Sequence, residues 1–243
     1  MKEVTEVLWH EHTREEIPAF AEKGAVVVVP IASNEQHGIA LPVDTDCRTV
    51  EYVSVRAAQL ANCPVLVTRV IPFGLSPHHM MYPGTITLTA ETAIRVLKDV
   101  VNSIVTHGFD HILILSGHGG NGPAIGAAAM ELKFQLCRQI EAGAWWEGTD
   151  EVFKAVCTGP CPGIGHAGEG EGSCILALRP DLVRSNKFGW VPGITDDPAL
   201  ATAEKGWHIL NGGAEILAKR YEALYNKPGR EVIGIMPAPG ARK

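Results

Sequence analysis

The sequence predicts an α/β fold in which helices pack against a largely parallel sheet. Three short apolar runs, at residues 25–32, 64–71 and 111–116, are rich in β-branched side chains and lack polar alternation. Strands that are buried on both faces have this composition. Helical patterns lie between and after the runs, and the alternation of strands with helices is typical of layered α/β proteins.

Four segments carry helical patterns, at residues 90–107, 122–140, 171–179 and 198–225. In the first of them the apolar residues recur on one face, with Thr89 as the expected N-cap and Gly108 as the expected stop. Pro180 ends the third helix, because its ring cannot continue a helical backbone. The sequence contains no internal repeat or low-complexity linker, which favours one domain over residues 1–243.

The composition and charge of the chain argue against some classes of partner. The chain has 243 residues, of which 46% are hydrophobic, and a net charge of −6. No stretch is rich in lysine or arginine, so a nucleic-acid partner is not expected. The longest apolar stretch, at residues 25–32, is too short to span a bilayer, and the charged N-terminal residues lack the apolar region of a signal peptide. We therefore expect a cytoplasmic protein without a membrane partner.

Polar side chains gather where the predicted strands end. Glu35, His37 and Asp46 follow the first strand, in a loop punctuated by glycine and proline. Glu35 and His37 project to the same side of an extended segment, because side chains alternate along it. Two carboxylates and an imidazole form a credible site for a divalent metal ion, and the alternative is a polar surface loop.

The glycine-rich segment 116–122, "SGHGGNG", allows two interpretations. Its glycines match the G-x-G-x-x-G pattern of dinucleotide-binding folds, which predicts an NAD-dependent oxidoreductase whose GHGGNG loop holds pyrophosphate. Alternatively, the small residues present His118 as a metal ligand. The loop follows several elements instead of opening a βαβ unit, and Glu141 precedes "AGAWW" instead of closing an apolar strand as a ribose-binding acid would. These two points favour the metal site.

Two further polar clusters follow apolar segments. The stretch "IGHAGEGEGS" contributes His166, Glu169 and Glu171. It leads into a predicted helix, where acidic residues are also favoured by the helix dipole. The stretch "FGLSPHHMMYPGTITL" contributes Ser76 and His79. Several clusters of histidines and acids at strand ends predict one shared pocket.

Five motifs together resemble the creatininase (creatinine amidohydrolase) family. In chain order they are "IASNEQHGIALPVDTD", "SPHHMMYPGTITL", "SGHGGN", "HAGEGEGS" and "DDPALATAEKG", and they span about residues 29–206. The resemblance implies a three-layer α/β/α fold and a hydrolase with two divalent metal ions, which would be zinc, manganese or iron. It also implies assembly as a homohexamer.

The resemblance further implies a set of metal ligands and a mechanism. By position in the motifs, Glu35 and His118 would hold one ion and His37 the other, with Asp46 bridging the two. Such a pair of ions makes hydroxide available from water near neutral pH, and the hydroxide would attack a carbonyl group of the substrate. His166 would then carry a proton to the leaving group.

The chain departs from creatininase itself at two neighbouring positions. Gly120 stands where creatininase has the glutamate that completes its second metal site, and Gly119 replaces an aromatic residue. We expect the missing carboxylate from Glu169 or Glu171, with Glu171 ahead because it aligns with the glutamate of the family's usual E-T-S motif. These replacements argue against a pocket shaped for creatinine itself.

Residues of the same loops would bind the substrate. We expect contacts from Ser76, His79, Gly119, Gly120, Trp145 and Trp146. For the two tryptophans, packing in the core is the alternative role. Arg48 and Arg69 are candidates to counter a substrate carboxylate.

The function predicted from the sequence is that of a dinuclear metal-dependent hydrolase acting on a small polar cyclic amide or ketone. An alternative within the same family is a hydrolase that opens an inosose-type cyclic ketone in carbohydrate catabolism. An alternative of another class is the NAD-dependent oxidoreductase. A binding protein with a closed, structural metal site is a third alternative, because a catalytic site keeps a coordination position open.

Overall fold

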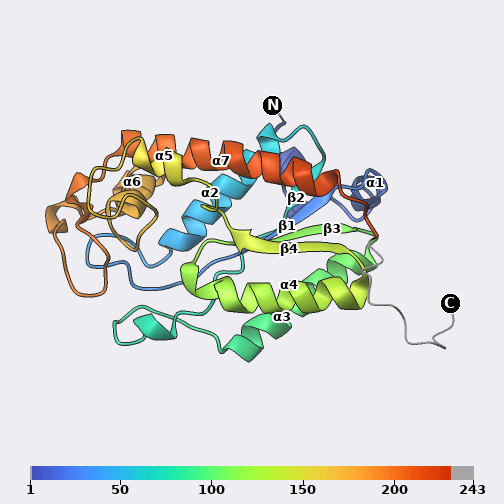
Figure 1. The fold of residues 1–243 in the computed structure, drawn as a ribbon, viewed down its shortest axis with the longest axis horizontal. Helices are drawn as coiled ribbons and strands as arrows, with labels where there is room; N and C mark the ends of the chain where they lie inside the picture. The colour runs from blue at the N-terminus through green and yellow to red at the C-terminus, as the bar shows by residue number, and fades with distance from the viewer. Residues whose placement is uncertain (1, 231–243) are drawn as a thin grey trace.

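A parallel four-stranded sheet forms the middle of the protein, whose computed structural model describes residues 2–230 (Figure 1). In sheet order, the strands are β2 (Val65–Val67), β1 (Val26–Ile31), β3 (His111–Ser116) and β4 (Gln139–Ala144). Every residue of β1 and β3 is buried, as expected for strands covered on both faces. The α/β fold with a largely parallel sheet is thereby confirmed.

Two layers of helices enclose the sheet and give a three-layer α/β/α architecture (Figure 1). The longer helices are α2 (Thr45–Leu60), α3 (Ala90–Thr106), α4 (Gly122–Leu136), α6 (Glu169–Leu178) and α7 (Ala203–Tyr225). Val26 and Val28 belong to the core formed with α2 and α7, whereas Val27 and Val29 belong to the core formed with α3 and α4. Consecutive residues of β1 pack into the cores on opposite faces of the sheet, because side chains alternate along a strand.

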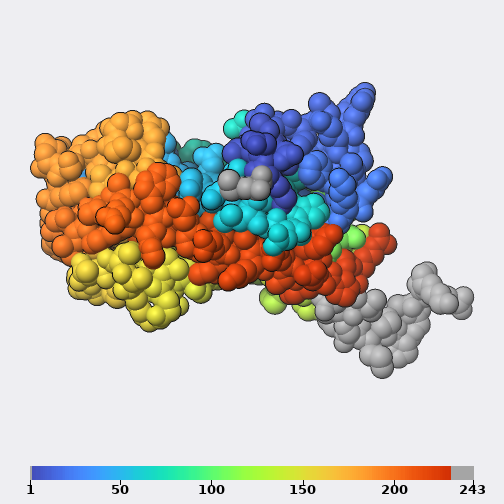
Figure 2. All heavy atoms as spheres, turned by 90° about the horizontal axis from the view of Figure 1, so that it is seen from above, coloured from blue at the N-terminus to red at the C-terminus, as the bar shows by residue number. Residues whose placement is uncertain are grey.

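Helix α7 runs along the molecule, from the part formed by residues 150–200 toward the N-terminal segment (Figure 2). Thr202 caps its start by accepting a hydrogen bond from the backbone N–H of Lys205. Gly213 lets the ring of Trp145 approach the helix closely, since a Cβ at this position would lie 2.9 Å from the ring.

Short helices complete the fold, and some of them carry site residues. They are α1 (Ile17–Glu22), α5 (Asp150–Lys154) and the 3-10 turns Thr5–Val7, Trp9–Glu11, Pro77–His79, Gly119–Asn121, Pro180–Leu182, Ser185–Lys187 and Pro198–Leu200. Within residues 2–230, no helix has both the length and the apolar character needed to cross a membrane. The single domain expected over residues 1–243 extends beyond the described residues at both ends and stays a prediction.

The predicted helix at residues 90–107 is confirmed together with both of its ends. Thr89 Oγ1 accepts a hydrogen bond from the Thr92 N–H at 3.2 Å, and Gly108 stops the helix with a φ of +95°. The predicted helix at 198–225 begins later, at Ala203, because the chain first makes the separate turn Pro198–Leu200.

Among the strands and the longer helices, α2 and β4 were not predicted. Helix α2 begins at Thr45, inside the segment interpreted as a loop, so Asp46 lies in the first turn of a helix. The helix predicted over residues 122–140 was too long, because Cys137 adopts a left-handed conformation with φ of 53° and ends α4. The chain then enters β4, whose sequence "QIEAGA" lacks the β-branched composition of the other strands.

Candidate metal centre

The candidate site lies where the loops after β1 and β3 meet segments from distant parts of the chain. A cavity of about 520 Å³ opens there. The rest of its walls comes from the start of α2, the turn Pro77–His79, Trp146 after β4, the loop that leads into α6 together with Glu171, and residues 193–195. The lining residues predicted from the sequence include Glu35, Asp46, His79, His118, His166 and Glu171. Loops that follow parallel strands at one edge of the sheet have therefore formed the shared pocket that was expected.

Four buried side chains form a cluster of carboxylates and imidazoles beside this cavity. His118 Nδ1 lies 3.1 Å from Glu35 Oε1 and 3.3 Å from Asp46 Oδ2. His37 Nε2 lies 3.2 Å from Asp46 Oδ1. Asp46 thus contacts both imidazoles, each through a different carboxylate oxygen, which is the arrangement that a bridging ligand requires.

The backbone around the two imidazoles determines which ring nitrogen faces the cluster. His37 Nδ1 lies 3.1 Å from the Glu35 carbonyl oxygen, and His118 Nε2 lies 3.0 Å from the Leu75 carbonyl oxygen. Because a carbonyl oxygen only accepts hydrogen bonds, each of these nitrogens carries the proton of the neutral ring. In the neutral form, which is the form that binds a metal ion, the lone pairs of His37 Nε2 and His118 Nδ1 therefore lie on the side of the carboxylates.

Unpartnered acceptors in the cluster fit a metal ion. Within the described residues, Glu35 Oε1, His37 Nε2 and Asp46 Oδ2 are buried and have no hydrogen-bond partner. Ligand atoms of Glu35, His37 and Asp46 lie within 4.8 Å of one another, which is a spacing suited to one ion. Buried acceptors that face one another are costly unless a cation lies among them. The donor set of carboxylates and imidazoles suits zinc, manganese or iron.

Burial and the neighbouring opposite charges shift the pKa values of this cluster in opposite directions. Although burial opposes the shift, His37 and His118 lower the pKa of Asp46 to about 2. Burial also disfavours the charged form of His118, but Asp46 and Glu35 outweigh it and raise the pKa of His118 to about 10. The carboxylates therefore favour a positive charge in their midst.

The two glutamates expected to complete the site point in different directions. Glu171 lines the cavity, and its Oε2 lies 3.3 Å from His37 Nε2. Glu169 is fully buried, accepts hydrogen bonds from two backbone N–H groups of the preceding loop, and pairs with Lys205 Nζ at 2.5 Å. The structure thus brings Glu171 to the cluster and directs Glu169 away from it.

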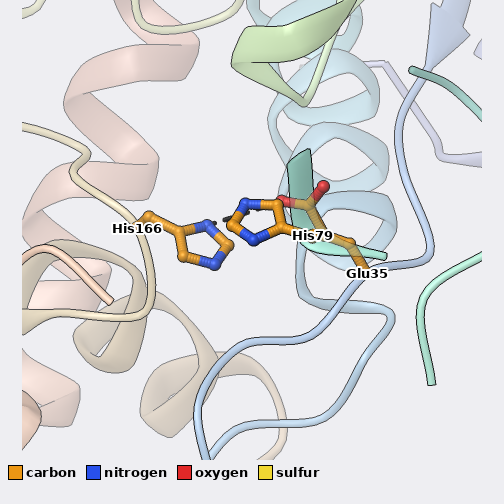
Figure 3. Close-up of side chains that lie close together, drawn as sticks. All are labelled: Glu35, His79 and His166. Atoms are coloured by element: carbon orange, nitrogen blue, oxygen red, sulfur yellow. Dashed lines mark ion pairs between the residues drawn. The ribbon is translucent and has the colours of Figure 1, made fainter. Parts of the chain in front are cut away.

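A second pair of imidazoles faces the same glutamate (Figure 3). His166 Nδ1 lies 3.4 Å and His79 Nε2 lies 3.7 Å from Glu35 Oε1, and the two rings stack with their centroids 4.3 Å apart. Ser76 donates a hydrogen bond from its hydroxyl to the other oxygen, Glu35 Oε2. Burial lowers the pKa of both His79 and His166, which favours their neutral forms.

Gln36 belongs to the site and was missed by the sequence analysis. The Gln36 side-chain nitrogen lies 2.9 Å from His79 Nδ1 and 3.0 Å from His166 Nε2. The only signal in the sequence was its place between Glu35 and His37. That signal is weak, because the side chain of the middle residue in an extended segment is expected on the opposite side.

The residues expected to bind substrate divide between the cavity and the core. Trp146 and Gly119 line the cavity, whereas Trp145 is 1% exposed and belongs to the hydrophobic core. Gly120 also lines the cavity, and a Cβ there would clash with a neighbouring carbonyl oxygen and with the His118 ring. No carboxylate side chain therefore fits at position 120 without a shift of its surroundings.

The glycine-rich loop packs closely against the cluster. A Cβ at Gly117 would lie 2.7 Å from the Asp46 carbonyl oxygen, and the ring of His118 is buried. Glu141 lies in the middle of β4, a strand that was not predicted, and therefore does not close that strand. Its carboxylate pairs with Lys227 Nζ at 2.6 Å, so it is engaged within the chain. This geometry favours the loop as a support for His118.

Comparison with known proteins adds independent observations. The sequence profile of the family described as creatininase, creatinine amidohydrolase, matches residues 10–192. A mycofactocin precursor peptide peptidase of Mycobacterium ulcerans (strain Agy99) is 31% identical in an alignment of 213 residues that covers 76% of this chain and 79% of that protein. The 3-dehydro-scyllo-inosose hydrolase of Thermotoga maritima is 29% identical in an alignment of 233 residues that covers 90% of this chain and 74% of that protein.

A solved structure has the same architecture. The crystal structure of a creatinine amidohydrolase (creatininase) aligns with a TM-score of 0.79 over 92% of this chain and 99% of that chain. The sequences are 22% identical, so this likeness establishes the fold alone.

Proposed function

Because the chain belongs to the creatininase family and is a hydrolase of that family, we propose that it uses two divalent metal ions to hydrolyse a bond at a carbonyl group of a small, polar, uncharged substrate. A cyclic amide or ketone is our first candidate. The observation that carries this proposal is the buried cluster around Asp46, with its unpartnered acceptor atoms. Solved creatininases include a Zn–Zn form and a Mn form, which supports the choice of metals.

The cluster offers ligands for two ions. Glu35 and His118 would hold one ion, His37 and Glu171 would hold the other, and Asp46 would be shared. When bound, divalent ions polarise a carbonyl oxygen and lower the pKa of water, which supplies a nucleophile at neutral pH. In this assignment Glu171 takes the role that a side chain at position 120 would otherwise have.

We propose that His166 transfers a proton to the leaving group. Its Nδ1 faces the cavity near Glu35, and its backbone is held on both sides by Thr195. The His166 N–H donates to Thr195 Oγ1 at 2.8 Å, and the Thr195 N–H donates to the His166 carbonyl oxygen at 2.9 Å. A ring held in this way keeps its nitrogen at a constant place in the cavity, as proton transfer requires.

The lining of the cavity supports an uncharged substrate. Within the described residues, no lysine or arginine lines the cavity, and its charged groups are carboxylates and imidazoles. Arg48, considered from the sequence as a partner for a substrate carboxylate, pairs with Asp44 at 2.5 Å, and Arg69 does not line the cavity. A volume of about 520 Å³ suits a small molecule.

A peptide amide is the second candidate, because a further hollow of about 370 Å³ adjoins the cavity. The hollow shares His118, Gly119 and Trp146 with the cavity, and small residues of α4 and β4 line much of the rest. A chain that extends on both sides of the cleaved bond would occupy both spaces. The peptidase relative of M. ulcerans supports this candidate, and the hydrolase of T. maritima supports the inosose-type ring as the other alternative.

Metal content is the first test of the proposal. We expect elemental mass spectrometry to find about two transition-metal ions per chain after purification without chelator, because a dinuclear site holds its ions through several charged ligands. Asp46→Ala should lose both ions, whereas Asp44→Asn, at the half-exposed partner of Arg48, should keep them. Less than one ion per chain, with no gain on adding zinc, manganese or iron, would contradict the proposal.

A substrate screen with the metal-loaded protein then separates the candidates. The panel contains creatinine, other cyclic amides, formamides, inosose-type ketones and short peptides. Hydrolysis of a ring would support the first candidate, and cleavage of peptides alone would support the second. Reduction of NAD without any hydrolysis would support the oxidoreductase instead. The hexamer and the cytoplasmic location stay predictions, and light scattering of the purified protein checks the first of them.

A further inference from the structure

The amide of Gln36 connects the two imidazoles of Figure 3 to the backbone of Gly193, which also lines the cavity. The side chain is 5% exposed, and its nitrogen lies 2.6 Å from the Gly193 carbonyl oxygen. The same nitrogen lies 2.9 Å from His79 Nδ1 and 3.0 Å from His166 Nε2. One amide group therefore serves three potential acceptors, two of which are ring nitrogens.

Two backbone groups determine the orientation of this amide. The Gly38 N–H donates to Gln36 Oε1 at 2.9 Å, and the Gly193 carbonyl oxygen faces Gln36 Nε2. A backbone N–H only donates and a carbonyl oxygen only accepts, so a rotated amide would lose both hydrogen bonds. The NH2 end of Gln36 therefore faces the two histidines.

The orientation of the amide sets the protonation of both rings. An NH2 group donates and does not accept, so His79 Nδ1 and His166 Nε2 must offer lone pairs. The single proton of each neutral ring then lies on the other nitrogen, which is Nε2 in His79 and Nδ1 in His166. These two nitrogens face Glu35 Oε1 in the cavity (Figure 3). One amide hydrogen is donated to the Gly193 carbonyl oxygen. The other is shared between the acceptor nitrogens of the two stacked rings.

We propose that Gln36 is a positioning residue that holds His79 and His166 as neutral rings with their N–H groups directed into the cavity. The two rings can then donate to the oxygen of a bound carbonyl, and neither is a metal ligand. The Nδ1 proton of His166 is the one that would pass to the leaving group in the proposed function. The group formed by Glu35, His79 and His166 has the spacing of a metal site, but the nitrogens that face Glu35 carry protons. The role of these donors in catalysis rests on the proposed function. The assignment of the two tautomers does not depend on it.

The tautomers can be measured directly. We would record two-bond 1H–15N correlation spectra of the zinc-loaded protein with 15N-labelled histidine, and assign the signals with His79→Gln and His166→Gln. We expect the Nε2–H tautomer for His79 and the Nδ1–H tautomer for His166. The opposite tautomer in either ring, or a zinc-bound signal at either cavity-facing nitrogen, would overturn the proposal. This result does not depend on any substrate, so a failure of the proposed hydrolysis would leave it standing.

Variants of Gln36 add a second readout. Gln36→Met keeps the approximate size of the side chain and removes the donor, and Gln36→Glu replaces the donor with acceptors. We expect Gln36→Met to mix the tautomers of both rings and Gln36→Glu to place protons on His79 Nδ1 and His166 Nε2. Unchanged tautomers in both variants would contradict a role for Gln36. Far-UV circular dichroism and metal content should match the wild type, which excludes misfolding as the cause.

Kinetics on the substrate found in the screen test the consequence for the reaction. Loss of a partner that orients a site histidine typically lowers activity by about 10- to 100-fold, and we expect Gln36→Met to lower kcat by this factor with little change in KM. Gln135→Met, which changes an exposed glutamine of α4, is the matched control and should leave kcat unchanged. A rise in KM alone would show that Gln36 contributes to substrate binding and would contradict the positioning role.

Discussion

Two of the pairs of histidines near Glu35 differ in the group that faces the far nitrogen of each ring. In the first pair, His37 and His118, that group is a backbone carbonyl, so the lone pair points inward to the carboxylates. In the second pair, His79 and His166, it is the amide NH2 of Gln36, so the proton points inward. Rings of the same type at the same spacing are thereby suited to opposite tasks.

This comparison shows why ligand spacing by itself does not identify a metal ligand. Both the group Glu35, His37 and Asp46 and the group Glu35, His79 and His166 bring three donor atoms within 4.8 Å. A metal ion binds a lone pair, so only an imidazole whose proton is held elsewhere can serve as a ligand. The hydrogen bond on the outer side of the ring therefore decides its role.

The largest effect should come from removing a ring of the first pair. His118→Ala should lower the metal content and reduce kcat/KM by more than about 10³-fold, because the metal-dependent chemistry is lost with the ion. Elemental analysis and steady-state kinetics measure the two effects. If this variant kept the metal content of the wild type, His118 would not be a metal ligand. The proposed difference between the two pairs of histidines would then be contradicted.

Removing a ring of the second pair should have a smaller effect of a different kind. We expect His166→Ala to keep the wild-type metal content and to lose about 10²- to 10³-fold in kcat, as for the loss of a preorganised hydrogen-bond donor. The same two measurements apply. Loss of metal from His166→Ala would place this ring with the ligands and would contradict the comparison.

Neighbouring glycines provide a test of how closely the chain packs around His118. A Cβ at Gly120 would clash with the His118 ring, whereas a Cβ at Gly119 meets no atom within 4 Å. We expect Gly120→Ala to lower the free energy of unfolding by about 1–3 kcal/mol and to weaken metal binding, since overpacking displaces neighbouring groups. Gly119→Ala should change stability by less than about 0.5 kcal/mol. Denaturant unfolding and metal titration compare the two variants, and equal behaviour would contradict the predicted clash.

The smallest effect on the site should come from Lys205→Met, although its effect on stability is large. The substitution leaves the fully buried Glu169 without its ion partner, which typically costs about 3–5 kcal/mol in the free energy of unfolding. Metal content should stay at the wild-type value, because Glu169 points away from the cluster. Lys154→Met, in an exposed pair with Glu151, is the control and should leave stability almost unchanged. Loss of metal in Lys205→Met would contradict this prediction and would indicate that Glu169 contributes to metal binding.

Local physical rules account for most of what could be predicted. The apolar runs that became β1 and β3 are buried on both faces, and the end signals at Thr89 and Gly108 bound α3 as expected. These features depend on neighbours in the chain, which periodicity and capping reveal. Strand β4 was not predicted because its small residues have no strong β-strand propensity. Its place next to β3 comes from tertiary packing.

The direction of a side chain follows from the bounds of the element that carries it, and the sequence analysis did not give these bounds for α6 and β4. Glu169 and Glu171 lie two positions apart in a helix, where each residue turns by about 100°, so the two carboxylates point to nearly opposite sides. Trp145 and Trp146 lie in the turn that follows β4, where Trp145 packs in the core and Trp146 lines the cavity. Neither pair could be resolved from the sequence, because the predicted helix began at residue 171 and β4 was not predicted.

The residue types at the ends of the strands, and hence the chemistry of Glu35, His37, Asp46 and His118, are determined by the sequence alone. The protonation of the rings is not, because it depends on partners that only folding brings together. The Gly193 carbonyl oxygen orients the amide of Gln36 across a separation of 157 residues, and Gln36 reaches His166 across 130 residues. A hydrogen bond depends on the distance and angle between two groups, which local sequence patterns do not encode for groups so far apart in the chain.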